Sequence, residues 1–103
     1  MKEIDKHFIG KYVIIRTYSA GVWAGKILMK EGMQVVLTNA RRLWMWKAKE
    51  SISLSAVALY GIDQKNSRIA PQVCEVGLDA IEIISTSDNS EKSIQGAPIE
   101  PAK

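Results

Sequence analysis

The sequence predicts a mainly β domain of the α+β class, built as a small β-barrel or a strongly bent antiparallel sheet in the order β-β-β-α-β-β. Two observations carry this prediction. Runs rich in β-branched and aromatic residues alternate with short turns along most of the chain, and one segment between them changes to the spacing of a short helix. A chain of 103 residues supports one modest core, and five short strands can bury it by curling into an SH3-like or Sm-like barrel.

Three strands are expected first, each joined to the next by a tight connection. They cover residues 11–18, 22–30 and 33–46. Gly21 ends the first turn, where it can adopt a positive φ at little cost, and Glu31–Gly32 forms the second. Short connections join antiparallel neighbours, so these strands should form a meander.

Two positions should interrupt the strands. Gly25 lies inside the second strand, where a glycine indicates a bulge or a close backbone approach. Asn39–Ala40 lies inside the third strand, where we expect a break or bulge that redirects the side chains after it.

A short helix is expected within residues 51–62. Its apolar residues recur at helical spacing, namely Leu54, Val57 and Ala58. Gly61 is a stop signal, and Ser51 or Ser53 is the candidate N-cap.

The last two strands are expected at residues 69–76 and 79–86. Pro71 places the first of them late or at a sheet edge, because proline cannot donate to a strand ladder. The chain then loses its aromatic residues and becomes polar, so it cannot bury enough apolar surface to offset its ordering entropy. We therefore predict one β-rich domain over residues 1–85 and a flexible tail over residues 86–103.

The charge is mildly basic. The chain carries +3, and its last eighteen residues hold three acidic residues against two lysines, which leaves +4 on the rest. This excess favours anionic partners, although an ordinary solvated surface explains it equally well. No apolar run approaches the ~20 residues of a membrane helix, and neither a signal peptide nor a disulfide is indicated, so a cytoplasmic location is expected.

Catalytic and metal-binding groups are scarce. His7 stands in a charged N-terminal stretch and is expected to be solvated. Cys74 lies in an expected strand without a nearby histidine, so we expect a buried, inert thiol. Three acidic residues, Glu75, Asp79 and Glu82, should point outward. The sequence thus predicts a non-catalytic protein without a metal or another cofactor.

The richest candidate for a binding site is the run ARRLWMW, residues 40–46. Strand alternation separates two faces, one with Arg42, Trp44 and Trp46 and the other with Arg41, Leu43 and Met45. The second face suits the core through its leucine and methionine. An exposed indole can stack on a nucleobase for roughly 1–3 kcal/mol, and a guanidinium matches phosphate oxygens. The alternative, that both tryptophans fill a small core, stays open because large aromatic residues are mostly buried.

The turn after the first strand is a second candidate. Arg16 and Tyr18 share one face of that strand, and Trp23 follows the turn. Backbone N–H groups of residues 19–21 could form a nest that binds an anion, although an ordinary tight hairpin explains the same residues.

The stretch from Tyr12 to Gly61 resembles a family of small proteins of tailed bacteriophages, a domain of unknown function. It contains S-A-G-V-x-x-G, then A-R-R-L-W-x-W, then S-L-x-x-x-A-x-x-G. It is also similar to phage anti-Thoeris proteins that sequester immune signals of the cyclic ADP-ribose type without cleaving them. This resemblance implies a phage accessory protein, a homo-oligomer that holds such a signal or a cyclic oligonucleotide.

The resemblance also implies roles for the candidate residues. Arginines hold phosphates, a tryptophan stacks on a base, the turn supplies backbone N–H groups, and a serine and an asparagine bind ribose or base edges: Arg16, Ser19, Gly21, Trp23, Asn39, Arg41, Arg42 and Trp44. Since two arginines are adjacent in a strand, we expect the break at Asn39–Ala40 to direct Arg42 with the tryptophans and Arg41 toward the turn at 19–21.

Two other functions stay open. The basic and aromatic strand also suits a nucleic-acid-binding module on an SH3-like or Sm-like barrel. The same residue types are enriched at interface cores, so the run could instead join subunits of an oligomer.

Overall fold

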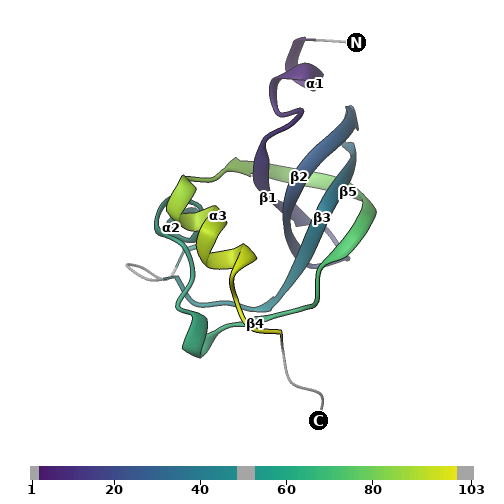
Figure 1. Ribbon diagram of the computed structural model, residues 1–103. Coiled ribbons are helices and arrows are strands. Elements are labelled where there is room, and N and C mark those ends of the chain that lie inside the picture. Colours follow the sequence, from purple (N-terminus) through teal and green to yellow (C-terminus); the bar gives the residue numbers. More distant parts are fainter. Residues whose placement is uncertain (1–2, 49–52, 100–103) are drawn as a thin grey trace.

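A five-stranded antiparallel sheet bends until its strands close a ring. The computed structural model describes residues 3–48 and 53–99, with strands β1 (Tyr12–Thr17), β2 (Val22–Glu31), β3 (Gln34–Met45), β4 (Arg68–Ile69) and β5 (Val73–Ser85). Strands β1 and β3 each pair with both β2 and β5, and β4 adds an edge beside β3 (Figure 1). The fold is therefore the mainly β, strongly bent antiparallel one that the sequence predicts.

One long strand replaces the two strands expected at residues 69–76 and 79–86. The first half of β5 pairs with β3 up to Asp79, and its second half pairs with β1 from Ala80 onward. The strand bends between its two partners instead of turning, so the prediction of a break there was wrong. Of the strand expected from residue 69, the part before β5 is reduced to the two-residue β4, which ends at Ile69 because Pro71 cannot donate to a strand ladder.

Short helices complete the fold, namely α1 (Glu3–His7), α2 (Leu54–Tyr60), the 3-10 turn η1 (Gln64–Asn66) and α3 (Asp88–Gln95). Helix α2 is the predicted one, since Ser53 accepts from Ala56 N–H as N-cap and Gly61 ends the helix at φ 94°. The other N-cap candidate, Ser51, lies outside the described residues. Within residues 3–48 and 53–99, no helix has the length and apolarity to cross a membrane.

The segment predicted as a tail is part of the folded domain. Helix α3 packs beside α2 (Figure 1) and buries Ser90, Ser93 and Ile94. The two serines stabilise the buried helix through hydrogen bonds and not through apolar contacts. Ser90 Oγ donates to Val57 O at 2.6 Å, and Ser93 Oγ accepts from Ile62 N at 3.1 Å. Composition alone could not show this, and the boundary at residue 85 was wrong. Residues 100–103 lie outside the described part.

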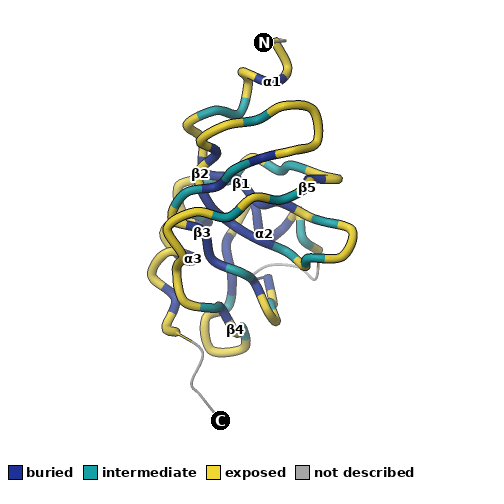
Figure 2. The backbone as a smooth tube through the Cα atoms, turned by 90° about the vertical axis from the view of Figure 1, so that its right-hand side faces the viewer, coloured by how far each residue is buried: buried dark blue, intermediate teal, exposed yellow. Residues whose placement is uncertain are grey.

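Two apolar clusters hold the structure together, and β1 contributes to both. Val13 and Ile15 join side chains from β2, β3 and β5 inside the ring. Tyr12 and Ile14 point the other way and pack under α2 and α3. Burial on both faces explains why β1 begins with four consecutive apolar residues, from Tyr12 to Ile15 (Figure 2).

Both expected interruptions occur. A Cβ on Gly25 would lie 3.1 Å from Thr38 O and 3.2 Å from Ala40 Cα, so β2 and β3 approach closely there. Asn39 has φ 51°, and the β2–β3 register shifts beside it. The bulge reverses the alternation of β3, so Leu37 and Ala40 both point into the ring.

Candidate functional site

Four of the predicted site residues line one hollow. Ser19 and Gly21 supply the β1–β2 turn, and Arg42 and Trp44 supply the end of β3. Ala20 and Leu43 complete a volume of about 320 Å³. Cross-strand pairing brings these segments together, because Val22 pairs with Leu43 and Trp23 pairs with Arg42.

Arg42 lies over the indole of Trp23. Its guanidinium carbon is 4.6 Å from the ring centroid, which is cation–π geometry. Trp23 is buried and fixed, since its Nε1 donates to Ala20 O at 3.0 Å. Arg42 Nε is buried and has no hydrogen-bond partner among the described residues. The fold thus holds a cation at the hollow and leaves one of its donors unused.

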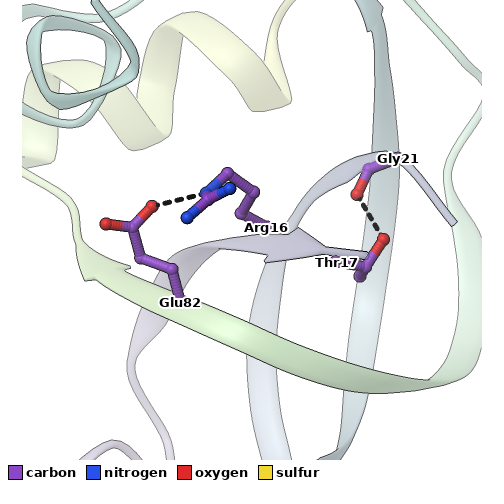
Figure 3. A network of polar contacts seen from close by, with 4 residues as sticks. All are labelled: Arg16, Thr17, Gly21 and Glu82. Atoms are coloured by element: carbon purple, nitrogen blue, oxygen red, sulfur yellow. Dashed lines mark hydrogen bonds and ion pairs between the residues drawn. The ribbon is translucent and has the colours of Figure 1, made fainter. Parts of the chain in front are cut away.

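Thr17 fixes the turn that forms the other wall. Its hydroxyl donates to Gly21 O at 2.7 Å, as Figure 3 shows, and accepts from Ala20 N at 2.8 Å. Gly21 has φ 85°. Within the described chain, the N–H groups of Ser19 and Gly21 donate to no other residue. These two N–H groups remain available to an anion. Sequence analysis missed Thr17, although a threonine ahead of a Ser-Ala-Gly turn is a known turn signal.

The two tryptophans of the run ARRLWMW have different environments. Trp44 is 65% exposed, so a core role for it was a wrong alternative. Trp46 is half-buried and packs against the cluster under α2 and α3. Leu43 is buried as expected, whereas Met45 is exposed because β3 passes the end of the ring there.

Arg41 is structural, and its predicted place at the turn was wrong. It is 3% exposed and points under α3. Its guanidinium donates to five backbone oxygens, those of Ala70 (2.8 Å), Ile94 (2.8 Å), Ala97 (2.8 Å), Gln95 (3.3 Å) and Ile69 (3.4 Å). Burial lowers the pKa of Arg41, and the neighbouring Tyr12 opposes that shift. The bulge at Asn39 sends this side chain outside the ring.

Two further predicted residues do not line the hollow. Arg16 Nε donates to Glu82 Oε1 at 2.9 Å in an exposed ion pair (Figure 3). Asn39 is exposed at the bulge, where its Oδ1 accepts from Gln72 Nε2 at 3.5 Å. Arg16, Asn39 and Arg41 thus lie apart from the residues around Arg42.

The remaining reactive groups lie elsewhere. Cys74 is exposed on β5, so its predicted burial was wrong, because that half of the strand faces solvent. His7 is exposed on α1 with its ring 4.8 Å from that of Phe8. Within the described residues, no group of three or more histidine, cysteine or acidic side chains is arranged to hold a metal ion.

Comparison with known proteins assigns a family. Residues 10–94 match the model of a domain of unknown function, DUF6948, so the chain belongs to that family. No curated protein and no solved structure matches the chain. The match covers the ring, α2 and every residue of the hollow.

Proposed function

We propose that this member of the DUF6948 family binds a small anionic nucleotide in the hollow between residues 19–21 and Arg42–Trp44. The observation that carries the proposal is an exposed indole, that of Trp44, beside a guanidinium that a second indole holds in place. Base stacking and phosphate binding need these two groups side by side.

Each part of a nucleotide has a partner in this arrangement. The base stacks on Trp44, which contributes roughly 1–3 kcal/mol. The phosphate accepts from Arg42 and from the free N–H groups of Ser19 and Gly21, and charged hydrogen bonds of this kind contribute about 1.5–3 kcal/mol each. The hydroxyl of Ser19 is the group in the hollow that we propose as the hydrogen-bond partner of the ribose.

The volume and the charge of the hollow limit which ligands it can hold. A volume of about 320 Å³ is near the lower end of the range for ligand pockets. Among the residues that line the hollow, one is cationic and none is acidic. We therefore propose that the hollow takes one nucleotide unit with one phosphate, either free or as part of a cyclic ADP-ribose-type molecule or a cyclic oligonucleotide.

The proposed role is sequestration in the cytoplasm of a phage-infected cell. The support is the resemblance to phage proteins that hold immune signals intact. In addition, no carboxylate, imidazole or thiol lines the hollow. The activity that we propose is therefore binding without catalysis, and we expect the protein to release the signal chemically unaltered when it unfolds.

Calorimetry with a nucleotide panel tests the proposal. The panel contains AMP, cyclic ADP-ribose, a cyclic dinucleotide and, as fragments, adenosine and ribose 5-phosphate. Trp44→Ala and Arg42→Met should each weaken binding about 10-fold or more, since 1.4 kcal/mol is a tenfold change. Arg16→Met is the matched control, because this exposed arginine does not line the hollow, and it should bind as the wild type does.

Release and salt dependence separate the alternatives. Heat-denatured complex should yield unaltered ligand by chromatography, whereas altered ligand would identify an enzyme. Affinity should fall gently with salt, because a single phosphate contact releases few counterions, whereas a nucleic-acid polymer would show a steep fall. The proposal fails when no panel member binds or when both hollow variants bind as tightly as the wild type.

A further inference from the structure

A second hollow opens at the tip of the β2–β3 hairpin, apart from the nucleotide site. It has a volume of about 660 Å³. Its walls are largely apolar, and its rim is polar: Ile9, Leu28, Met29, Lys30, Glu31, Gln34, Val35, Val36, Gly77, Leu78 and Asp79. Leu28 and Met29 are 46% and 57% exposed, and Met33 in the hairpin turn is 56% exposed. Apolar exposure of this kind around a cavity is typical of an interaction surface.

Helix α1 is fastened to the same tip. Asp5 Oδ1 accepts from Lys30 Nζ at 2.9 Å and from Gly32 N at 3.2 Å, and both side chains of this ion pair are largely buried. The attachment leaves Ile4 on α1 74% exposed. Figure 1 shows that helix α1 and the β2–β3 hairpin lie at the same end of the molecule. This end therefore carries both the exposed side chain of Ile4 and the apolar hollow.

The polar groups on these two surfaces are complementary. His7 stands three residues after Ile4, so both lie on one face of α1, where the exposed imidazole can donate a hydrogen bond. The hollow carries two exposed carboxylates on its rim, those of Glu31 and Asp79. A surface that holds both the projecting side chain and its receptor fits a second copy of itself across a two-fold axis.

We propose that two copies of this chain associate here, with Ile4 of each copy entering the hairpin-tip hollow of the other. The exchange covers the exposed side chains of Leu28, Met29 and Met33. It also extends the apolar cluster inside the ring, because Val35 and Leu78 belong to that cluster and line the hollow. Small domains gain stability in this way because their own cores are limited.

Sedimentation equilibrium of the full chain tests the proposal. The wild type should have twice the mass of one chain. Ile4→Lys removes the projecting side chain, and Met29→Glu places a charge in the hollow; each should give a monomer. Leu59→Glu is the matched control, since Leu59 is 60% exposed on α2 and outside this surface, and it should stay dimeric.

Mixing the two monomeric variants tests the reciprocal arrangement. A heterodimer of Ile4→Lys and Met29→Glu keeps one native contact and gains a lysine–glutamate pair at the other, so the mixture should recover the dimer mass. Circular dichroism must show that both variants are folded, and Met33→Glu in the turn, which also places an acidic group beside the hollow, replaces Met29→Glu where that variant is not. A monomeric wild type, or folded variants whose mixture stays monomeric, would overturn the proposal.

Discussion

Replacing Arg41 should destabilise the fold far more than replacing its neighbour Arg42. Arg41→Met keeps the length of an apolar stem but removes the guanidinium that connects β3 to the backbone of α3 and β4. The oxygens of Ala70, Ile94 and Ala97 would then lose donors at 2.8 Å. The loss of a donor to a buried carbonyl is costly. The oxygen of Ile94 keeps the N–H of Ala97 at 3.2 Å, so the oxygens of Ala70 and Ala97 are the more affected.

The expected loss follows from these three short bonds. Hydrogen bonds to charged groups contribute about 1.5–3 kcal/mol each, but the desolvation of a buried cation offsets part of their sum. A net loss of about 3 kcal/mol remains, which is a large share of the typical 5–15 kcal/mol for a domain. At about 4–8 °C per kcal/mol, the melting temperature should fall by about 12–24 °C.

Urea denaturation followed by tryptophan fluorescence measures this difference. Arg42→Met is the control, because within the described residues the side chain of Arg42 has a cation–π contact with Trp23 and its buried Nε has no hydrogen-bond partner. Its stability should stay within about 1 kcal/mol of the wild type. An Arg41→Met protein as stable as the wild type, or an Arg42→Met protein that loses more, would refute the division of roles between the two arginines.

Three further predictions follow from single side chains. Burial raises the pKa of Tyr12 above its unfolded value of about 10. The stability that its neutral phenol provides is therefore present below that pH and is lost as the pH rises further. In urea denaturation, Tyr12→Phe should reduce the fall of the unfolding free energy above about pH 10, and an unchanged fall would contradict the shift. Gly25→Ala should cost about 1–3 kcal/mol by calorimetry, because the added Cβ lies 3.1 Å from Thr38 O, whereas Gly77→Ala meets nothing within 4 Å and should cost little; equal losses would refute the close approach. Cys74 should react with one equivalent of a thiol reagent in the native protein, and a reaction that requires denaturant would show that the thiol is covered.

Local signals in the sequence predicted the elements that depend on neighbouring residues. The tight β1–β2 turn at Gly21, the N-cap at Ser53 and the close approach at Gly25 each follow from the conformational preference of one residue type. Helix α3 was missed because its burial depends on serine hydroxyls that donate to distant carbonyls, such as Ser90 to Val57. Average hydrophobicity carries no signal of such pairs.

The separate roles of Arg41 and Arg42 depend on one extra residue in β3. Val35 and Leu37 point into the ring, and unbroken alternation would continue through residues 39 and 41 on that same face. The bulge at Asn39 shifts the alternation, so Ala40 and Arg42 face the ring and Trp23, while Arg41 and Leu43 face α2 and α3. The sequence indicated the break but not the partners on either side, because the carbonyls that bind Arg41 come from residues 69–97. Since all three guanidinium nitrogens of Arg41 donate to backbone oxygens, Arg42 is the arginine of this pair that is left for a ligand, and the proposed site requires that arrangement.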